Sequence, residues 1–321
     1  MRILSGIQPS GSLHLGNYFG AIEQFLNFQE KSDELFVFIA DLHALTTTKN
    51  AEELRRNSFE VAAAYLALGL IGEKTLLYRQ SNVPEVLELN WILSCLAPMG
   101  LLERAVSFKD KVAKGLEANV GLFNYPVLQA ADILIMQPDK IPVGKDQKQH
   151  LEITRDLADK FNSTFGETLK LPEAEIPKNV ATVPGTDGEK MSKSYGNTIE
   201  IFAEEKVLQK QVMSIVTDST PKGEALDYAK CNVFALFKLV ANEDESHALA
   251  EKYRNGEVGY GDAKKLLLEK VLEKFGSARE KFEELRKNPA EVEQVLVKGE
   301  EKARTEAREN LKLIREKVGL K

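Results

Sequence analysis

A short stretch near the N-terminus has the residue types of a phosphate-binding helix start. The run Pro9-Ser-Gly-Ser-Leu-His-Leu-Gly-Asn17 follows an apolar segment that we predict to be a buried strand, and it leads into a helical pattern. The start of a helix carries free N–H groups and a partial positive charge, which favour phosphate. His14 and Asn17 share one helix face and offer donors to negative oxygens, and Gly16 leaves room for a flat ring. The alternative is a capped helix start with a packing glycine.

The second candidate is the basic loop Lys190-Met-Ser-Lys-Ser194, which follows the turn-forming stretch Pro184-Gly-Thr-Asp-Gly188. Two lysines three positions apart suit the β- and γ-phosphates of a nucleotide. They would act most strongly in the transition state, when negative charge moves onto the leaving pyrophosphate. The alternative is a solvated basic loop. Neither candidate has the glycine pattern of a dinucleotide-binding dehydrogenase or a P-loop NTPase.

Three polar residues, Tyr125, Gln129 and Asp132, share one face of an apolar helix that we expect to begin near Pro126. Their neighbours indicate burial, and buried polar groups need partners. An amino acid supplies such partners: an ammonium for Tyr and Gln, and a side-chain N–H or O–H for the carboxylate. The alternative is a solvated surface helix.

A further polar segment stands where a strand should meet a helix, which is the usual ligand crevice of an open parallel sheet. It contains Gly144 and Asp146. His150 is expected one turn inside that helix, in a structural role.

Short apolar runs alternate with amphipathic segments over the first part of the chain. This order predicts an α/β fold, a Rossmann-like, mostly parallel sheet covered on both faces, in a nucleotide-binding domain over 1–195. Beyond it, Glu, Lys, Leu and Ala recur with helical periodicity and predict a C-terminal all-helical domain over 196–321. The expected strands are 3–7, 35–40, 75–78 and 141–143, and the expected helices are 15–29, 51–68, 86–96, 126–136 and 147–161.

The bulk composition is that of an ordinary globular protein, with 43% apolar and 29% charged residues. We see no secretory signal and no apolar run near the ~18 residues of a membrane helix, so we expect a soluble, cytoplasmic protein without membrane contact. Cys95 and Cys231 lie far apart, and no Cys-x-x-Cys pair accompanies the four histidines, so we expect no protein-bound metal. The net charge of −6 gives no argument for RNA binding.

Together the two motifs resemble the signature sequences of class I aminoacyl-tRNA synthetases. Over essentially its whole length the chain is similar to the bacterial tryptophanyl-tRNA synthetases within that class. The matching strings include Ser5-Gly-Ile-Gln-Pro-Ser-Gly11, Leu101-Leu-Glu-Arg104, Ala130-Ala-Asp-Ile133, Val143-Gly-Lys-Asp-Gln-Lys-Gln-His150 and Thr217-Asp-Ser219.

The resemblance implies a set of nucleotide contacts. ATP would be bound by Gln8, Pro9, Ser10, Gly16, Asn17, Gly144, Lys145, Asp146, Val183, Lys190, Met191, Ser192, Lys193 and Ser194. The residues implied in catalysis are Lys190, Lys193, Lys111, His14 and Gln8.

The resemblance also implies an amino-acid pocket. Asp132 would accept the indole N–H of L-tryptophan, while Tyr125 and Gln147 would face its ammonium; a second amide, Gln129, stands on the same helix face. The remaining pocket residues would be His43, Leu4, Gly6 and Val143.

Two positions depart from the family pattern. Asn17 replaces the second histidine of the first signature, and Gln129 stands where the family usually has Met. Tyr-x-x-x-Gln-x-x-Asp is the pattern with which tyrosyl-tRNA synthetases hold tyrosine, so tyrosine is the alternative substrate. The Lys-Met-Ser-Lys-Ser loop and the lack of a separate C-terminal RNA-binding domain favour tryptophan. A non-synthetase nucleotidyltransferase would lack this pentapeptide, and a retired paralogue would have lost one of its lysines or Asp132.

The implied reaction forms tryptophanyl-adenylate and pyrophosphate from L-tryptophan and ATP, and then transfers tryptophan to tRNA(Trp). Mg²⁺ would be bound chiefly through the ATP phosphates. The helical domain would read the anticodon region, and a homodimer would form around residues 87–102, within an insertion over about 80–125. The last helix should pack back on the catalytic domain through Ala303, Ala307, Ile314 and Val318. Its basic stripe, which is either an RNA contact or a solvated face, is Arg304, Arg308, Lys312 and Arg315.

Overall fold

The centre of the molecule is a parallel sheet. The computed structural model describes residues 1–70, 72–105, 119–142, 144, 148–175, 183–221 and 223–321. Its five described strands lie in the order β3-β2-β1-β4-β5. They are β1 (Arg2–Ile7), β2 (Glu34–Ile39), β3 (Thr75–Arg79), β4 (Lys140–Pro142) and β5 (Glu173–Glu175). The predicted parallel sheet is therefore confirmed, and the apolar residues of β2 are buried because helices cover both of its faces.

The strand order reverses at β1. The chain moves outward through β2 to the edge strand β3 and then returns to β4 on the other side of β1. At such a switch point the adjoining loops run in opposite directions, and a crevice opens at the carboxyl ends of the strands. This crevice lies between β1 and β4.

The helices beside the sheet follow the predicted segments closely. They are α1 (Leu15–Asn17), a π-helical turn (Tyr18–Ile22) and α2 (Glu23–Lys31) in one continuous run, then α3 (Asp41–Ala44), α4 (Ala51–Ala67), α5 (Glu85–Leu96), α6 (Met99–Glu103), α8 (Val120–Ile135) and α9 (Lys148–Phe165).

One helix boundary was wrong in the prediction. Helix α8 begins at Val120 and not near Pro126, which lies inside it. Asn119 caps the helix because its side chain accepts the N–H of Leu122 at 2.8 Å. Strand β5 was not predicted, since Glu173 and Glu175 give it no apolar run.

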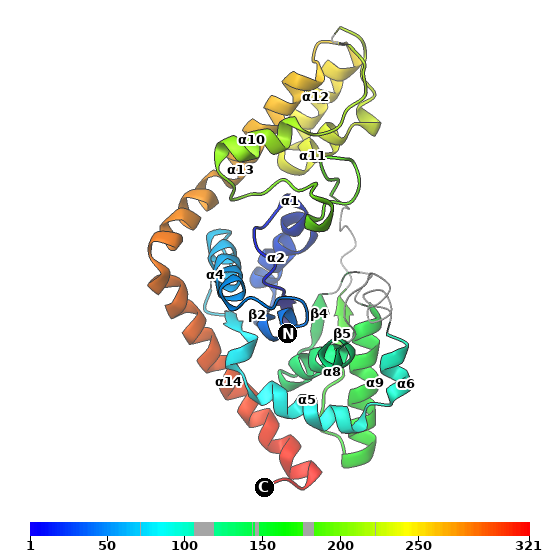
Figure 1. Cartoon of the computed structure of the whole chain (residues 1–321), viewed down its shortest axis with the longest axis vertical. Coiled ribbons are helices and arrows are strands. Elements are labelled where there is room, and N and C mark those ends of the chain that lie inside the picture. The colour runs from blue at the N-terminus through cyan, green and yellow to red at the C-terminus, as the bar shows by residue number, and fades with distance from the viewer. Residues whose placement is uncertain (71, 106–118, 143, 145–147, 176–182, 222) are drawn as a thin grey trace.

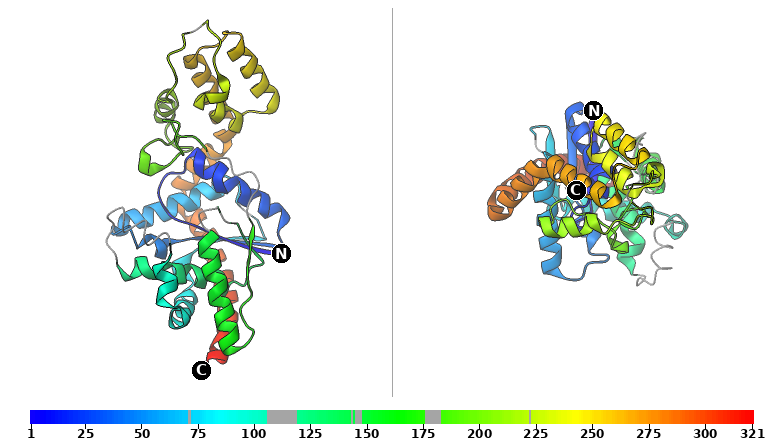
Figure 2. Two further views of the ribbon diagram at one scale, coloured as in Figure 1. Left: turned by 90° about the vertical axis from the view of Figure 1, so that its right-hand side faces the viewer. Right: turned by 90° about the horizontal axis from the view of Figure 1, so that it is seen from above.

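A helical module stands at one end of the sheet, at the top of Figure 1 and of the left panel of Figure 2. Leu15 and Met191 pack in its core with residues such as Phe275, so both candidate phosphate motifs adjoin the module. Its helices are α10 (Glu205–Met213), α11 (Asn232–Val240), α12 (Glu243–Arg254) and α13 (Tyr260–Lys287).

Helix α14 (Pro289–Val318) runs from α13 to the opposite end of the molecule and packs against β3 (Figure 1). Ala303, Ala307 and Ile314 are buried in a core shared with α5 and α8, and Val318 packs against it. The closest approach is at Gly299, where a Cβ would lie 2.1 Å from the carbonyl oxygen of Leu77 on β3. The helix therefore lies directly against the backbone of the edge strand. None of the described helices is long and apolar enough to cross a membrane.

Candidate active site

A cavity of about 430 Å³ lies at the switch point of the sheet, a size typical of small-molecule sites. The carboxyl end of β1 forms its floor. At Gly6 a Cβ would lie 2.5 Å from the ring of Phe38, so only glycine lets this ring lie against the strand. The cavity is lined by Leu4, Ser5, Gly6, Gln8, Phe38, Ala40, His43, Tyr125, Gln129, Ile133, Ile141, Pro142 and His150.

The structure thus brings together predicted site residues from three separate segments of the chain: five that were proposed for the amino-acid pocket, and Gln8, which was proposed for ATP. The predicted residues in the lining are Leu4, Gly6, Gln8, His43, Tyr125 and Gln129. Other predicted site residues lie outside the described residues, namely Lys111, Val143, Lys145, Asp146 and Gln147. Gly144 is described and exposed.

Asp132 lies behind the cavity and is only 3% exposed. Its carboxylate accepts hydrogen bonds from His43 Nε2 at 2.8 Å and from Gln80 Nε2, which lies 2.8 Å from both oxygens. Burial raises the pKa of Asp132 above its ordinary value, and the bonds from His43 and Gln80 oppose that rise. The sequence showed no protein partner for this carboxylate because both partners are distant in the chain. Sequence reasoning missed Gln80, although a glutamine that ends a buried strand was a usable signal.

Tyr125 and Gln129 face the cavity from α8. The Tyr125 hydroxyl is hydrogen-bonded to His150 Nε2 at 2.8 Å. His150 also lines the cavity, beside the Tyr125 hydroxyl, whereas the sequence placed it only in a structural role. The Gln129 amide makes no hydrogen bond with any residue that the structure describes, so its donors and acceptor are available to a ligand.

The first phosphate motif lies next to the basic loop. His14 is 6% exposed, and its backbone N–H donates to Asn17 Oδ1 at 3.1 Å. The Gly16 N–H donates to Met191 Sδ at 3.3 Å, and a Cβ at Gly16 would lie 2.9 Å from His14 Nδ1. Burial, helped by the charge of Lys193, lowers the pKa of His14 to about 4. The imidazole is therefore neutral near pH 7, and its buried Nδ1 has no partner among the described residues.

Asn197 organises the basic loop and was missed from the sequence. It is 2% exposed; its Oδ1 accepts the Ser192 N–H at 2.7 Å, and its Nδ2 donates to Asp187 at 2.7 Å and to the Lys190 carbonyl at 3.2 Å. Gly185 must be glycine, since a Cβ there would lie 2.2 Å from Asn197 Nδ2. A single buried amide thus fixes the backbone that carries both lysines.

The two lysines of the loop differ in their surroundings. Lys190 is exposed, while Lys193 donates to the carbonyl oxygen of Ser10 and so joins the two motifs. Burial lowers the pKa of Lys193. Beside them Val183 and Met191 are buried in the core shared with the helical module, and Ser194 is exposed. The arrangement places cations and a neutral imidazole around the start of α1.

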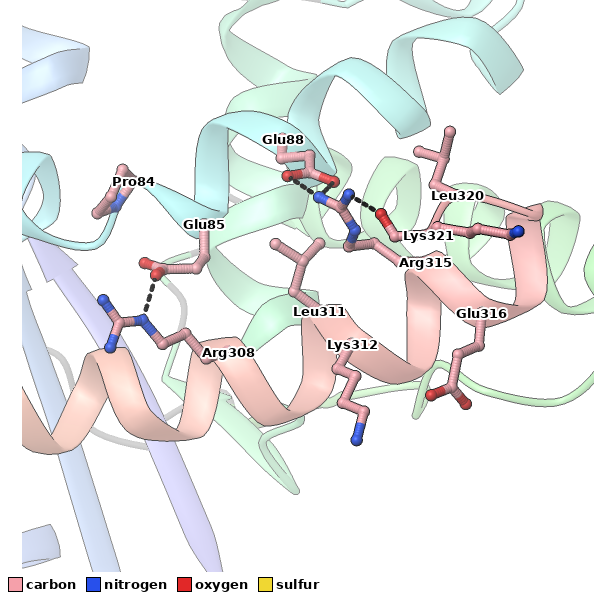
Figure 3. Close-up of a pocket in the computed structure, with 10 residues that line it drawn as sticks. All are labelled: Pro84, Glu85, Glu88, Arg308, Leu311, Lys312, Arg315, Glu316, Leu320 and Lys321. Carbon is pink, nitrogen blue, oxygen red and sulfur yellow. Dashed lines mark hydrogen bonds and ion pairs between the residues drawn. The ribbon is translucent and has the colours of Figure 1, made fainter.

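Arg308 and Arg315 of the basic stripe of α14 point toward α5 (Figure 3). Arg304 and Arg308 donate to Glu85 at 3.0 and 2.9 Å, and Arg315 donates to Glu88 at 2.7 Å. Lys312 points away from α5 in the same view. The three arginines are therefore ion-paired with α5, while their side chains remain 37% to 59% exposed.

Comparison with known proteins agrees with this geometry. The family model described as class I tRNA synthetases (W and Y) matches residues 1–276. A tryptophan–tRNA ligase of Campylobacter jejuni strain RM1221 is 53% identical over 320 residues, covering 100% of both chains. One from Fusobacterium nucleatum is 55% identical, covering 99% of this chain and 98% of that protein.

Solved structures show the same likeness. The tryptophanyl-tRNA synthetase of Campylobacter jejuni complexed with ADP and tryptophan superposes with a TM-score of 0.96 at 53% identity, covering 100% of both chains. A tyrosyl-tRNA synthetase from Archaeoglobus fulgidus, at 21% identity and a TM-score of 0.66, shares the fold. The chain belongs to the class I tRNA synthetases of the tryptophan and tyrosine family.

Proposed function

We propose that this enzyme is a tryptophan–tRNA ligase. It activates L-tryptophan with ATP to form tryptophanyl-adenylate and pyrophosphate, and then transfers tryptophan to the terminal adenosine of tRNA(Trp). The observation that carries the proposal is the buried carboxylate of Asp132 behind an aromatic-sized cavity whose lining includes Gln8, the residue before the first phosphate motif. The relatives that are 50–55% identical over the whole chain bear this name.

The cavity suits an aromatic amino acid. Leu4, Phe38 and Ile133 give it apolar walls, and Gln129 offers an unpaired amide at the wall formed by α8. Asp132 would accept the indole N–H, because a carboxylate has more acceptor sites than its two described partners use. A pocket built to bond such a donor rejects a side chain without it by as much as ~10⁴-fold.

The nucleotide would lie between the start of α1 and the basic loop. The substrate carboxylate is the nucleophile toward the α-phosphate, so catalysis needs position and charge, not a protein nucleophile. Lys190 and Lys193 would stabilise the negative charge as it moves onto the leaving pyrophosphate. Neutral His14 would donate one hydrogen bond. No cluster of acidic, His and Cys side chains that could hold a metal occurs in the described part of the chain. Mg²⁺ would be held chiefly through the ATP phosphates, where it neutralises their charge.

Tyrosine is the second candidate substrate, because Gln129 gives α8 the Tyr-Gln-Asp face of a tyrosine site. The decisive experiment is ATP–pyrophosphate exchange with each of the twenty amino acids, followed by aminoacylation of tRNA(Trp) and tRNA(Tyr). We expect exchange with tryptophan only. Equal or better exchange with tyrosine would assign the chain to tyrosine.

A homodimer is part of the proposal. Leu87, Trp91 and Met99 are exposed to 45%, 70% and 64%, although they are large and apolar, and they gather on α5 and α6. Such a patch marks a protein interface. Trp91 is the chain's one tryptophan, so its fluorescence reports burial on association. We expect a dimer in sedimentation experiments and a monomer with red-shifted emission from a Leu87→Asp/Met99→Asp variant that keeps Trp91.

The proposal also includes a division of the chain into two domains and a location in the cell. We place the catalytic domain in residues 1–195 and the part that reads the tRNA anticodon region in residues 196–321, and we place the enzyme in the cytoplasm, where its tRNA is.

A further inference from the structure

Gln80 does not line the cavity. It is hydrogen-bonded to Asp132, which lies behind the cavity, and to the backbone N–H of His43, which lines it. It follows β3 in a short 3₁₀ turn and is 1% exposed. Its Nε2 donates to both oxygens of Asp132 at 2.8 Å. Its Oε1 accepts the backbone N–H groups of Leu42 at 3.1 Å and His43 at 3.4 Å. One amide therefore joins the carboxylate on α8 to the segment that carries His43.

The chemistry fixes how this amide is turned. A flipped amide would place its oxygen against the Asp132 carboxylate and its NH₂ group against two N–H donors, and both contacts would be repulsive. His43 Nε2 is also bonded to Asp132 Oδ2 at 2.8 Å. The three residues thus form a closed triangle in which Gln80 touches both of the others.

The turn that carries Gln80 is itself held on both sides. Arg79 donates to Glu300 of α14 at 2.6 Å, and the Ser81 N–H donates to Asp41 at 2.9 Å. Supporting residues can hold a site in place only when their own positions are locked. Gln80 meets this condition.

Gln80 also donates without carrying a charge. An arginine or lysine at this place would neutralise Asp132 and leave a weaker acceptor for the substrate. An amide stabilises the buried carboxylate and leaves its charge to act on an indole N–H. A pocket that selects its substrate by an N–H donor needs such a charged acceptor.

We propose that Gln80 is a specificity-determining positioning residue, which holds Asp132 and His43 so that the carboxylate reads the indole N–H of the substrate. The proposal rests on the proposed function and deepens it. If Gln80 only satisfied buried groups, its loss would destabilise the fold without changing the choice among bound amino acids.

The test compares tryptophan with an analogue in which sulfur replaces the indole nitrogen, the benzothiophene analogue of tryptophan. In Gln80→Met we expect the KM for tryptophan to rise about tenfold to 100-fold, as for loss of a hydrogen bond to a charged group. The kcat/KM ratio of tryptophan to the analogue should fall at least tenfold, with kcat at saturating tryptophan and the KM for ATP within threefold of wild type. An unchanged ratio would overturn the proposal.

Gln80→Glu tests the donor end of the side chain separately, because it keeps the acceptor end and removes the donor. The new carboxylate still accepts the N–H groups of Leu42 and His43 but places a second negative charge beside Asp132, so one pKa of the pair is raised. Below that pKa the two carboxyl groups share one proton. Above it both are negatively charged and repel each other. The KM for tryptophan should therefore rise with pH between about 6 and 9 in this variant and not in wild type. If Gln80→Met fails to fold, this profile decides, and a profile parallel to wild type would contradict the proposal.

Gln29 supplies the matched control. Its amide also donates and accepts, to Gly69 at 3.1 Å and from Thr75 at 2.9 Å, and it is bonded to the other end of β3. Gln29→Met should leave the ratio unchanged. Failure of the proposed function would appear differently, as a wild-type enzyme that does not exchange with tryptophan.

Discussion

The two halves of the proposed active site, one for the amino acid and one for the nucleotide, differ in how their side chains are held. In the amino-acid half, Asp132, His43 and Gln80 are buried and bonded to one another. In the nucleotide half, Lys190 is exposed, and Lys193 is bonded to a neutral backbone carbonyl. The carboxylate of the first half is therefore fixed by buried protein partners, whereas the lysines of the second half are exposed or bonded to a neutral group.

This difference matches the two tasks of the enzyme. Selection of an amino acid needs fixed groups, because discrimination is lost when the reading carboxylate can move. Activation needs groups that bind most tightly when charge develops on the leaving pyrophosphate. A lysine on a backbone carbonyl can exchange that partner for a phosphate, since a bond between two ions is the stronger one.

The largest effect should come from Asp132→Ala. The change removes the proposed acceptor and leaves donors of His43 and Gln80 unpaired in a buried place, so kcat/KM for tryptophan should fall by about 10⁴-fold. Pyrophosphate exchange measures the loss, and circular dichroism checks that the fold persists. Exchange within threefold of wild type would show that Asp132 only stabilises the pocket.

Lys193→Ala should lower kcat for adenylate formation by ~10²–10³, as for loss of one preorganised charge-stabilising donor. The KM for tryptophan should barely change, because the lysine belongs to the other half. Lys264 is the control: it also donates to a backbone carbonyl, that of Met213 at 3.1 Å, but in the helical module. A defect confined to the tryptophan KM would erase the distinction between the halves.

Gln129→Met tests the amino-acid half at an amide that has no hydrogen-bond partner among the described residues. If the amide bonds the substrate ammonium, its loss costs about 1.5–3 kcal/mol and raises the KM for tryptophan about tenfold to 100-fold. Tyrosine should stay a poor substrate in both forms. An unchanged KM would mean that Gln129 is turned toward water or protein when tryptophan is bound.

The smallest effect concerns the stability of the nucleotide half. The pKa of His14 is about 4 in the folded chain against an ordinary 6.5, so between these values the unfolded chain binds the proton more readily. The free energy of unfolding should therefore fall as pH is lowered through this range, and less steeply in His14→Gln. His247→Gln, at an exposed histidine of α12, is the control. Equal slopes in wild type and His14→Gln would mean that His14 takes up a proton readily when folded.

The sequence predicted most helices and strands correctly, but it did not predict which distant side chains are hydrogen-bonded to one another. Apolar runs located β1 to β4 because buried parallel strands are continuously hydrophobic, while β5, with Glu173 and Glu175, gave no such signal. Motif spacing located Lys193 and His14. It could not show that Lys193 reaches Ser10, because periodicity carries no information about contacts between distant segments.

The same limit explains the missed residues. Gln80 and Asn197 are single amides whose importance lies in their partners, and those partners are distant or irregular in the chain. The arginines of α14 had the spacing of a basic surface. Only the three-dimensional structure shows that Glu85 and Glu88 of α5 already neutralise them.

The contact at Gly299 has a consequence for the ribosome-bound chain. Strand β3 is synthesised long before α14, which later lies against its outer edge. Until then a nascent chain carries an uncovered strand edge, the kind of surface that pairs with other chains. Helix α14, which emerges after the strands of the sheet, therefore covers the edge of β3.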